Sequence, residues 1–396
     1  MIPLRIGRVV ARLKTPAYLV TAASDIHYLT GFSLEGFWLL ITREGGFAFA
    51  SPLLAGHLRG VLDSINPNFA LGSRNSSSDA GLFLPKKDST VGNATLSLFS
   101  SKNSRPRSPR FSRPNAKVGI KVIESSNIFK AFVRFCKTNK IREVGFNPQK
   151  ISFALAGKLA AKVAMRPVDN DPVEAERIIK DAGEIEKIRQ SCSLAAKAYE
   201  HICKYVRPGV TEEQIGFKIE EYFAKNGAKT SFPCIVAAGP NSANPHHINS
   251  GRKIEENDVV LIDLGCILHG YCSDLTRTLF LGKINRFRAR IYSIVRAAHH
   301  LAIKRLKSGV KASAIDKTAR RTISACGYGR QFIHSTGHGV GIEIHESPRL
   351  GRHDNTLLKP GMVITVEPGI YLQGQFGVRI EDTLLITEKG NEVLTR

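Results

Sequence analysis

Two aspartates interrupt the most hydrophobic hairpin that the sequence predicts. In residues 259–282, apolar runs flank a polar Leu268-His269-Gly270 turn, so we expect two antiparallel strands. Counting back from this turn places Asp263 and Asp274 directly opposite each other. Two facing carboxylates in a hydrophobic sheet repel each other and lose hydration, which is costly unless a positive group lies between them. A bound metal ion is the simplest remedy.

Three further residues with metal-binding side chains occur in similar surroundings. Glu367 ends the apolar run at residues 362–366, Glu381 lies in a later apolar run, and His338 lies in a glycine-rich stretch where backbone segments can approach closely. Four carboxylates and one imidazole form a hard, oxygen-rich ligand set, which suits Mn²⁺, Mg²⁺, Co²⁺ or Fe²⁺ and argues against a thiolate zinc site. Two such ions, about 3.5 to 4 Å apart, would neutralise the acids and lower the pKa of a shared water towards neutrality.

Each of these residues, taken alone, has an ordinary structural explanation. An isolated aspartate in a hairpin is usually a turn or edge residue. His338 could be a hydrogen-bonded loop histidine, and Glu367, which precedes Pro-Gly, could simply close a strand. The combination of five, four of them in apolar strand context, favours the metal site.

The second half of the chain contains the helices that would support these strands. Apolar residues recur at three- and four-residue steps over residues 185–206, which predicts a helix. Thr211 and Gln214 form a capping-box pattern at the start of a second helix, and Asn226-Gly227 ends it. Two more helices are expected after Asn285 and Ser313.

The first 165 residues have an α/β pattern, and we predict one domain over residues 1–165 and a catalytic domain over residues 172–396. A hairpin with a Gly-containing turn is expected early in the chain. The expected strands are residues 18–21, 37–42, 47–50 and 143–146, and the expected helices are residues 53–62, 128–139 and 151–163, with residues 172–179 leading out of the domain.

The chain is strongly basic, with 57 Lys+Arg against 34 Asp+Glu in 396 residues. Part of this excess lies at residues 71–116, where Ser, Asn, Pro, Lys and Arg dominate without periodicity. We expect a disordered basic insertion there, and a regulatory or RNA-binding tail is the functional alternative. The remaining charge is spread over helix faces, which favours solvated charge over a dedicated nucleic-acid site. No apolar run approaches the roughly 18 residues of a membrane span.

Seven cysteines are scattered along the chain without a CxxC pair, which favours a reducing compartment. Cys266 and Cys272 flank a tight turn, but buried free thiols are the commoner outcome for such residues. No small-residue cleavage site follows the amino-terminal residues. We therefore expect a cytoplasmic protein without a leader.

The five candidate ligands, in their order and context, resemble those of the pita-bread metallopeptidases, the family of methionine aminopeptidase, Xaa-Pro aminopeptidase and prolidase. The family order Asp, Asp, His, Glu, Glu matches LIDLG, SDLTRT, STGHGVG, VEPGIY and VRIED in this chain. The resemblance implies that Asp263 chelates one ion and that His338 and Glu367 bind the other. Asp274 and Glu381 would bridge both.

Three histidines resemble active-site residues of the same family. His246, in SANPHH, resembles a histidine that contacts substrate and helps to move protons. His345, in EIHESP, resembles the one that stabilises the tetrahedral intermediate, and His334 resembles a substrate-contacting histidine of the proline-specific branch. Glu367 would relay the proton of the nucleophile towards the leaving proline nitrogen.

The role of Arg379, two residues before Glu381, stays open. It could orient that ligand, meet a substrate carboxylate, or form a structural ion pair. The resemblance covers roughly residues 172–396, and residues 274–278 (DLTRT) match the proline-specific branch. Residues 17–52 resemble the N-terminal domain of that branch, whereas methionine aminopeptidases usually lack a long one. The chain departs from the family at residues 71–116.

The resemblance implies an α/β creatinase-like N-terminal domain followed by an α+β pita-bread catalytic domain. Our main hypothesis is a dinuclear-metal Xaa-Pro aminopeptidase, and a Xaa-Pro dipeptidase (prolidase) is the alternative. A catalytically inactive binding protein is a weaker candidate because all five ligands are intact. A metal-free creatinase-type enzyme is also disfavoured, because that class loses the metal carboxylates. We expect two divalent ions per subunit, Mn²⁺ or else Co²⁺, peptide substrates with proline in second position, a homodimer, and neither a membrane nor a nucleic-acid partner.

Overall fold

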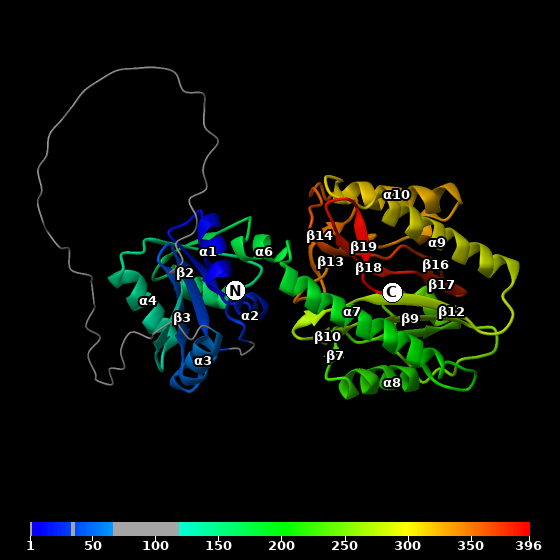
Figure 1. The fold of residues 1–396 in the computed structure, drawn as a ribbon, viewed down its shortest axis with the longest axis horizontal. Coiled ribbons are helices and arrows are strands. Elements are labelled where there is room, and N and C mark those ends of the chain that lie inside the picture. The colour runs from blue at the N-terminus through cyan, green and yellow to red at the C-terminus, as the bar shows by residue number, and fades with distance from the viewer. Residues whose placement is uncertain (1, 33–35, 66–118) are drawn as a thin grey trace, which may run out of the picture.

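The computed structural model describes residues 2–32, 36–65 and 119–396. The predicted insertion at residues 71–116 lies outside the described residues. Figure 1 shows an N-terminal unit joined through one short helix to a larger C-terminal unit.

The N-terminal unit is built around a six-stranded sheet with strand order β4-β3-β2-β1-β5-β6. β1 is antiparallel to β2 and parallel to β5. The strands of this sheet are β1 (Ala17–Val20), β2 (Trp38–Thr42), β3 (Gly45–Ala50), β4 (Ile120–Glu124), β5 (Glu143–Phe146) and β6 (Ala164–Pro167). Its helices are α1 (Ile2–Arg12), α2 (Ala23–Thr30), α3 (Pro52–Ile65), α4 (Ile128–Thr138) and α5 (Phe153–Ala160).

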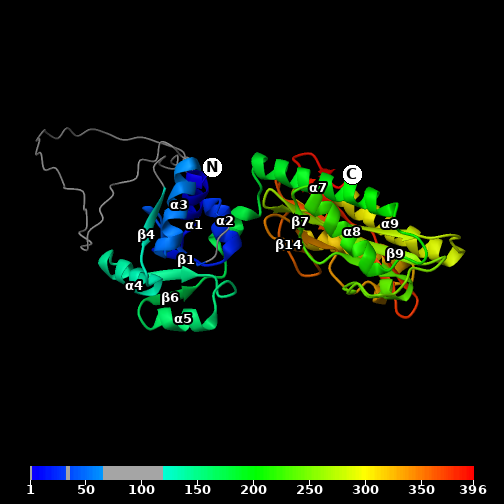
Figure 2. The ribbon, with the colours of Figure 1, turned by 90° about the horizontal axis from the view of Figure 1, so that it is seen from below.

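Helices cover both faces of this sheet, as Figure 2 shows. Alternate residues of a strand point to opposite faces, so the two sides bury different side chains of the same strand. Tyr18 and Val20 pack in a hydrophobic cluster with α1, α2 and α3. Ala17 and Leu19 pack in a second cluster with α4 and α5. The α/β fold predicted for this region is thus confirmed, although α1 and α2 were not predicted.

Helix α6 (Pro172–Arg177) connects the two units. The C-terminal unit then begins with α7 (Ala182–Cys203) and α8 (Glu212–Lys225) and contains α9 (Arg286–Arg305) and α10 (Ala312–Ala325). Its early strands are β7 (Lys229–Thr230), β8 (Ile235–Ala238), β9 (Val259–Leu264), β10 (Cys266–Leu268), β11 (Tyr271–Cys272) and β12 (Leu275–Phe280). Its late strands are β13 (Gly337–Gly339), β14 (Glu346–Leu350), β15 (Val363–Val366), β16 (Gly369–Leu372), β17 (Phe376–Arg379), β18 (Asp382–Ile386) and β19 (Asn391–Val393). Two short 3₁₀ helices are η1 (Gly239–Ala243) and η2 (Gly329–Gln331).

The strands of the C-terminal unit lie between two helix pairs, with α7 and α8 on one side and α9 and α10 on the other (Figure 1). One hydrophobic cluster joins α7 and α8 to β8, β9 and β12. Another joins α9 and α10 to β15, β16, β17 and β18. The C-terminal unit therefore has the α+β architecture that was predicted for it.

The helix-start signals in the sequence were mostly sound. Thr211 and Gln214 form the predicted reciprocal capping box of α8, and the Asn285 side chain caps α9 by accepting from the backbone N–H of Arg288. The predicted start of α10 at Ser313 was wrong, because the helix begins at Ala312 after Lys311, whose side chain makes no cap.

The seven cysteines are all free, and Cys266 and Cys272 are buried thiols that form no disulfide. Within the described residues, no helix combines the length and apolar character that crossing a bilayer requires.

Candidate metal centre and active site

The β9–β12 hairpin carries the two aspartates, but in a register two residues from the predicted one. Asp263 pairs with Thr276, so Asp274 lies just before β12 rather than opposite Asp263. The reason is a two-residue turn at His269 and Gly270, whose φ values of 52° and 80° are those that such a hairpin turn requires. A shift of two residues keeps both carboxylates on the same face of the sheet.

The other three candidate ligands come from the late strands. His338 lies in β13, Glu367 follows the last residue of β15, and Glu381 lies between β17 and β18. The predicted need for glycine beside His338 is met, since a Cβ at Gly337 would lie 2.0 Å from the carbonyl oxygen of Thr365. Only a residue without a side chain allows β13 to approach β15 this closely.

The structure brings these side chains to one place. His338 Nε2 lies 3.5 Å from Asp274 Oδ2 and 3.7 Å from Glu367 Oε1. One ligand atom each from Asp274, His338 and Glu381 lie within 4.8 Å of one another, as a shared metal ion would require. Residues from four separate strands or strand ends therefore converge, although they are spread over more than 100 positions of the sequence.

The carboxylates of this cluster are short of positive charge. Burial, reinforced by Glu381, Asp263 and Glu367, raises the pKa of Asp274 well above its usual value. Burial and the nearby acids likewise raise the pKa of Glu381. Burial raises the pKa of Glu367 to about 8, although Arg379 opposes the shift. A raised pKa means that the ionised form of the carboxylate is disfavoured, and a nearby cation would stabilise that form.

Two atoms show that the cluster fits a metal ion. Asp263 Oδ1 is buried without a hydrogen-bond partner, while Oδ2 accepts from Arg379 at 2.5 Å. His338 Nδ1 lies 3.0 Å from the Gly339 carbonyl, to which it can only donate, so Nε2 keeps a free lone pair facing the acids. Burial lowers the pKa of His338 to about 4, so the ring is neutral at physiological pH, as a metal ligand must be.

Arg379 is buried and fully engaged with protein groups. Nη2 donates to Asp263 and Nη1 donates to the Tyr371 hydroxyl at 2.9 Å. Nε donates to Thr276 Oγ1, whose hydroxyl donates to Glu381 at 2.6 Å. Of the three roles left open, this geometry supports orienting the metal ligands through a structural ion pair.

The predicted substrate-contacting histidines lie around the cluster. His334, His246 and His345 all line the same cleft as the five candidate ligands. The ring of His345 packs edge-on against that of His338, with 4.4 Å between centroids. His334 is held by its neighbours, because its two ring nitrogens lie 2.8 Å from the Ser335 carbonyl and from the Tyr371 hydroxyl. His345 is therefore better placed than His334 to donate a new hydrogen bond.

The cleft itself has a volume of about 780 Å³ and receives walls from both units. Gln149 and Lys150 of the N-terminal unit line it, together with Arg177 of α6 and Arg349 of β14. Arg349 was not predicted. Its guanidinium pairs with no carboxylate among the residues described, yet its charge opposes the rise in the pKa of Glu367 and disfavours protonation of His345. A single exposed arginine inside the segment ESPRL gave no local signal from which it could have been found.

Residues 186–388 match the metallopeptidase family M24. The chain is 41% identical over 273 residues to a protein of *Pyrococcus furiosus* named Xaa-Pro dipeptidase, covering 67% of this chain and 78% of the relative. The chain belongs to metallopeptidase family M24.

Solved structures extend this M24 assignment over both units. The fold matches a Xaa-Pro dipeptidase from *Bacillus anthracis* with a TM-score of 0.82 and 28% identity, covering 100% of this chain and 97% of that one. It also matches an X-Pro aminopeptidase from *Thermotoga maritima* with a TM-score of 0.77 and 27% identity, covering 98% and 97%. Both the predicted family and the predicted two-domain fold are thus confirmed, and the N-terminal unit is part of the shared architecture.

Proposed function

We propose that this M24 enzyme is a Xaa-Pro dipeptidase that uses two divalent ions. The dipeptidase was the alternative to our main hypothesis, a Xaa-Pro aminopeptidase. Two lines of support favour the dipeptidase. Similar proteins from *P. furiosus* and *B. anthracis* carry that name. The cleft also contains a cation, Arg349, that has no carboxylate partner among the described residues.

The single observation that carries the proposed metal chemistry is the convergence of buried acids around His338 with too little positive charge. Asp263 would hold one ion, His338 and Glu367 the other, and Asp274 and Glu381 would bridge them. When bound, such ions act as Lewis acids and lower the pKa of water, which provides a nucleophile near neutral pH. Mn²⁺ is our first candidate and Co²⁺ the second.

The protein side chains would then orient the peptide and move its protons. His345 faces the cleft, and its pKa is lowered by burial, so the neutral ring offers one N–H to the carbonyl oxygen that becomes negative. Glu367, which lies in the cleft beside His338, would carry a proton from water to the departing proline nitrogen, as the family resemblance implies. His246 would contact the substrate near its amino end.

Arg349 offers a physical reason for a preference for dipeptides. A Xaa-Pro dipeptide ends in a carboxylate next to the scissile bond, whereas a longer peptide has a neutral amide at that position. An unpaired guanidinium in a cleft lined by the catalytic residues can bind such a carboxylate through two parallel hydrogen bonds. We therefore propose that Arg349 binds the proline carboxylate.

Hydrolysis of Gly-Pro and of a Gly-Pro-Gly tripeptide, with Mn²⁺, with Co²⁺ and with chelator, tests the proposal. We expect metal-dependent cleavage with a higher kcat/KM for the dipeptide.

Arg349→Ala is expected to lower kcat/KM for Gly-Pro by about 10-fold or more, because a charge-assisted hydrogen bond is lost, and to change tripeptide cleavage little. Arg352→Ala removes an exposed arginine outside the cleft lining and is the matched control.

Equal kcat/KM values for the two peptides in the wild type would return the assignment to a Xaa-Pro aminopeptidase. No cleavage of either peptide with any metal would instead support an inactive binding protein on the same fold. A homodimer and a cytoplasmic location are further proposals, of which the first is checked by light scattering on the purified protein.

A further inference from the structure

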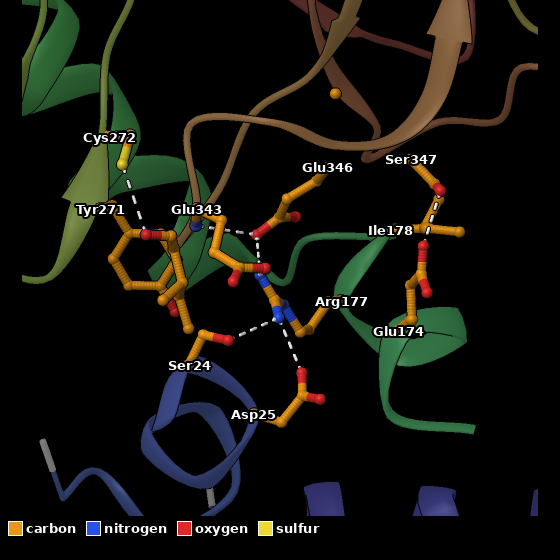
Figure 3. Close-up of polar contacts among 12 residues, drawn as sticks. Ser24, Asp25, Glu174, Arg177, Ile178, Tyr271, Cys272, Glu343, Glu346 and Ser347 are labelled. Atoms are coloured by element: carbon orange, nitrogen blue, oxygen red, sulfur yellow. Dashed lines mark hydrogen bonds and ion pairs between the residues drawn. The ribbon is translucent and has the colours of Figure 1, made fainter. Parts of the chain in front are cut away.

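Arg177, the last residue of α6, joins three separate parts of the protein (Figure 3). Its side chain is only 3% exposed. Nη1 donates to Asp25 Oδ1 at 2.7 Å, in α2 of the N-terminal unit. Nη2 donates to Glu343 Oε2 at 2.7 Å and to Glu346 Oε1 at 2.5 Å, in the segment that also carries His345. One buried guanidinium therefore connects the N-terminal unit, the connecting helix and the wall of the cleft.

Glu346 is the tightest contact of this group and directly follows His345 in sequence. Its second oxygen accepts from Lys180 Nζ at 3.0 Å. Although burial alone would raise the pKa of Glu346, Lys180 and Arg177 hold it at about 2, so the carboxylate stays charged. A Cβ at Gly341 would lie 2.5 Å from both carboxylate oxygens, so Glu346 rests directly on the backbone of Gly341. The carboxylate thus fixes both ends of the 341–346 loop.

Other contacts hold the same loop at its edges. The backbone N–H of Cys272 donates to the Gly341 carbonyl at 2.7 Å, and the Cys272 thiol donates to the Ile342 carbonyl at 3.3 Å. On the far side, Ser347 Oγ donates to Glu174 Oε1, in α6, at 2.7 Å. Figure 3 shows the contact of the Cys272 thiol on one side of the loop and the contact between Ser347 and Glu174 on the other. Between them lies His345, whose ring packs on the metal-ligand candidate His338.

From this arrangement we propose that Arg177 is a positioning residue for the hydrolysis, which holds His345 at the metal centre and couples its placement to the N-terminal unit. The inference rests on the proposed function, because it gives His345 a role in turnover. Arg177 also lines the cleft, but three carboxylates occupy Nη1 and Nη2, and Nε is buried, so the guanidinium is not available to bind a substrate carboxylate. Its effect on the reaction must therefore pass through the loop.

The alternative explanation is that Arg177 only stabilises the contact between the two units. A double-mutant cycle separates the two roles, because residues that act through each other have non-additive effects. The cycle uses Arg177→Met, His345→Ala and the double variant, measured with Gly-Pro and saturating Mn²⁺. Arg177→Met keeps the volume of the side-chain stem and removes the guanidinium.

We expect Arg177→Met to lower kcat by about 10²-fold, because a misplacement of His345 by about 1 Å would have an effect of that size. KM and the amount of bound metal should change by less than about twofold. In the His345→Ala background the same substitution should lower kcat by less than about threefold. Arg177→Lys should recover part of the loss. Amide hydrogen exchange in residues 341–347 should become faster in Arg177→Met, whereas that of β15 should not.

A second variant covers the case in which Arg177→Met does not fold. Glu343→Gln removes one partner whose side chain is 47% exposed, and we expect about a tenfold lower kcat that again vanishes in the His345→Ala background. Arg189→Met, which removes an ion pair with Glu392 outside the cleft lining, is the matched control and should leave kcat unchanged.

The outcomes are distinct. Suppose that the wild type cleaves Gly-Pro, but that Arg177→Met, or Glu343→Gln in its place, lowers kcat by the same factor with and without His345. The positioning role is then overturned and the proposed function stands. If the wild type cleaves no Xaa-Pro peptide with any metal, the proposed function fails and this inference fails with it.

Discussion

Two buried groups of carboxylates lie side by side in this protein and differ in how their charge is balanced. At the candidate metal centre, Asp274 and Glu381 have raised pKa values, and Arg379 is the cation that opposes the shift. At the contact between the two units, Glu346 is held at a pKa of about 2 by Lys180 and Arg177. Both groups are buried, so burial alone does not separate them.

The difference indicates which group needs a partner from outside the chain. The contact between the units contains its own cations, and it needs nothing further to be stable. The metal centre gathers acids that its own arginine does not neutralise, which is unfavourable in a folded core unless a cation binds. Asp25 is intermediate, because burial raises its pKa even though Lys150 and Arg177 both pair with it.

Removing one acid of the metal centre should have the largest effect. Asp274→Asn deletes a proposed metal ligand, and the loss of several kcal/mol of transition-state stabilisation corresponds to a roughly 10³-fold or greater fall in kcat. We also expect Mn²⁺ to raise the melting temperature of the wild type, because a ligand that binds the native state stabilises it, and not to raise that of Asp274→Asn. Kinetics, metal analysis and calorimetry with and without Mn²⁺ measure these effects.

Asp258→Asn, which breaks an ion pair with Arg252 away from the cleft lining, is the control and should keep both turnover and the Mn²⁺-dependent rise. If Asp274→Asn kept normal cleavage and normal metal content, the assignment of the metal centre would be wrong.

The same type of substitution should have opposite effects on stability in the two groups. In metal-free protein, Glu346→Gln leaves Arg177 and Lys180 buried with less compensation, and we expect the free energy of unfolding to fall by about 3 kcal/mol. Glu381→Gln removes a charge that its neighbours repel, so the free energy of unfolding should rise at pH 8. Urea unfolding in chelator measures both, and a loss of stability in both variants would contradict the contrast between the two groups.

The acids of the candidate metal centre could be predicted from the sequence, whereas the ion pairs between the two units could not. The metal-centre acids interrupt apolar strands, so each stands out locally, and their order resembles a known family. The contact between the units joins Asp25, Arg177 and Glu346, which are more than 150 positions apart and lie in no common pattern. Charged residues at such separations gave no signal before the fold was known.

Local signals also fixed most elements but not every register. The capping box of α8 and the strand at Glu143–Phe146 were predicted correctly because their determinants lie within a few residues. The hairpin register was two residues off, because it depends on which residues adopt positive φ in the turn. Helices α1 and α2 pack on the N-terminal sheet, and that tertiary contact, which sequence periodicity does not show, stabilises them.

The dependence of stability on pH gives the smallest and most specific test of the comparison. Glu346 has a pKa of about 2 in the folded protein, below the roughly 4.3 of an unfolded glutamate, so its contribution is present above pH 4.3 and is lost as the pH falls towards 2. Glu367 has a raised pKa of about 8, so its contribution to stability is present below pH 4.3 and is lost as the pH rises towards 8.

Metal-free protein should therefore lose stability between about pH 5 and pH 8, and Glu367→Gln should reduce that loss. Saturating Mn²⁺ should reverse the slope, because the ion binds the deprotonated carboxylates. Urea midpoints at pH 5 and pH 8, with chelator and with Mn²⁺, measure this, and parallel slopes in the two conditions would show that the raised pKa values do not belong to metal ligands.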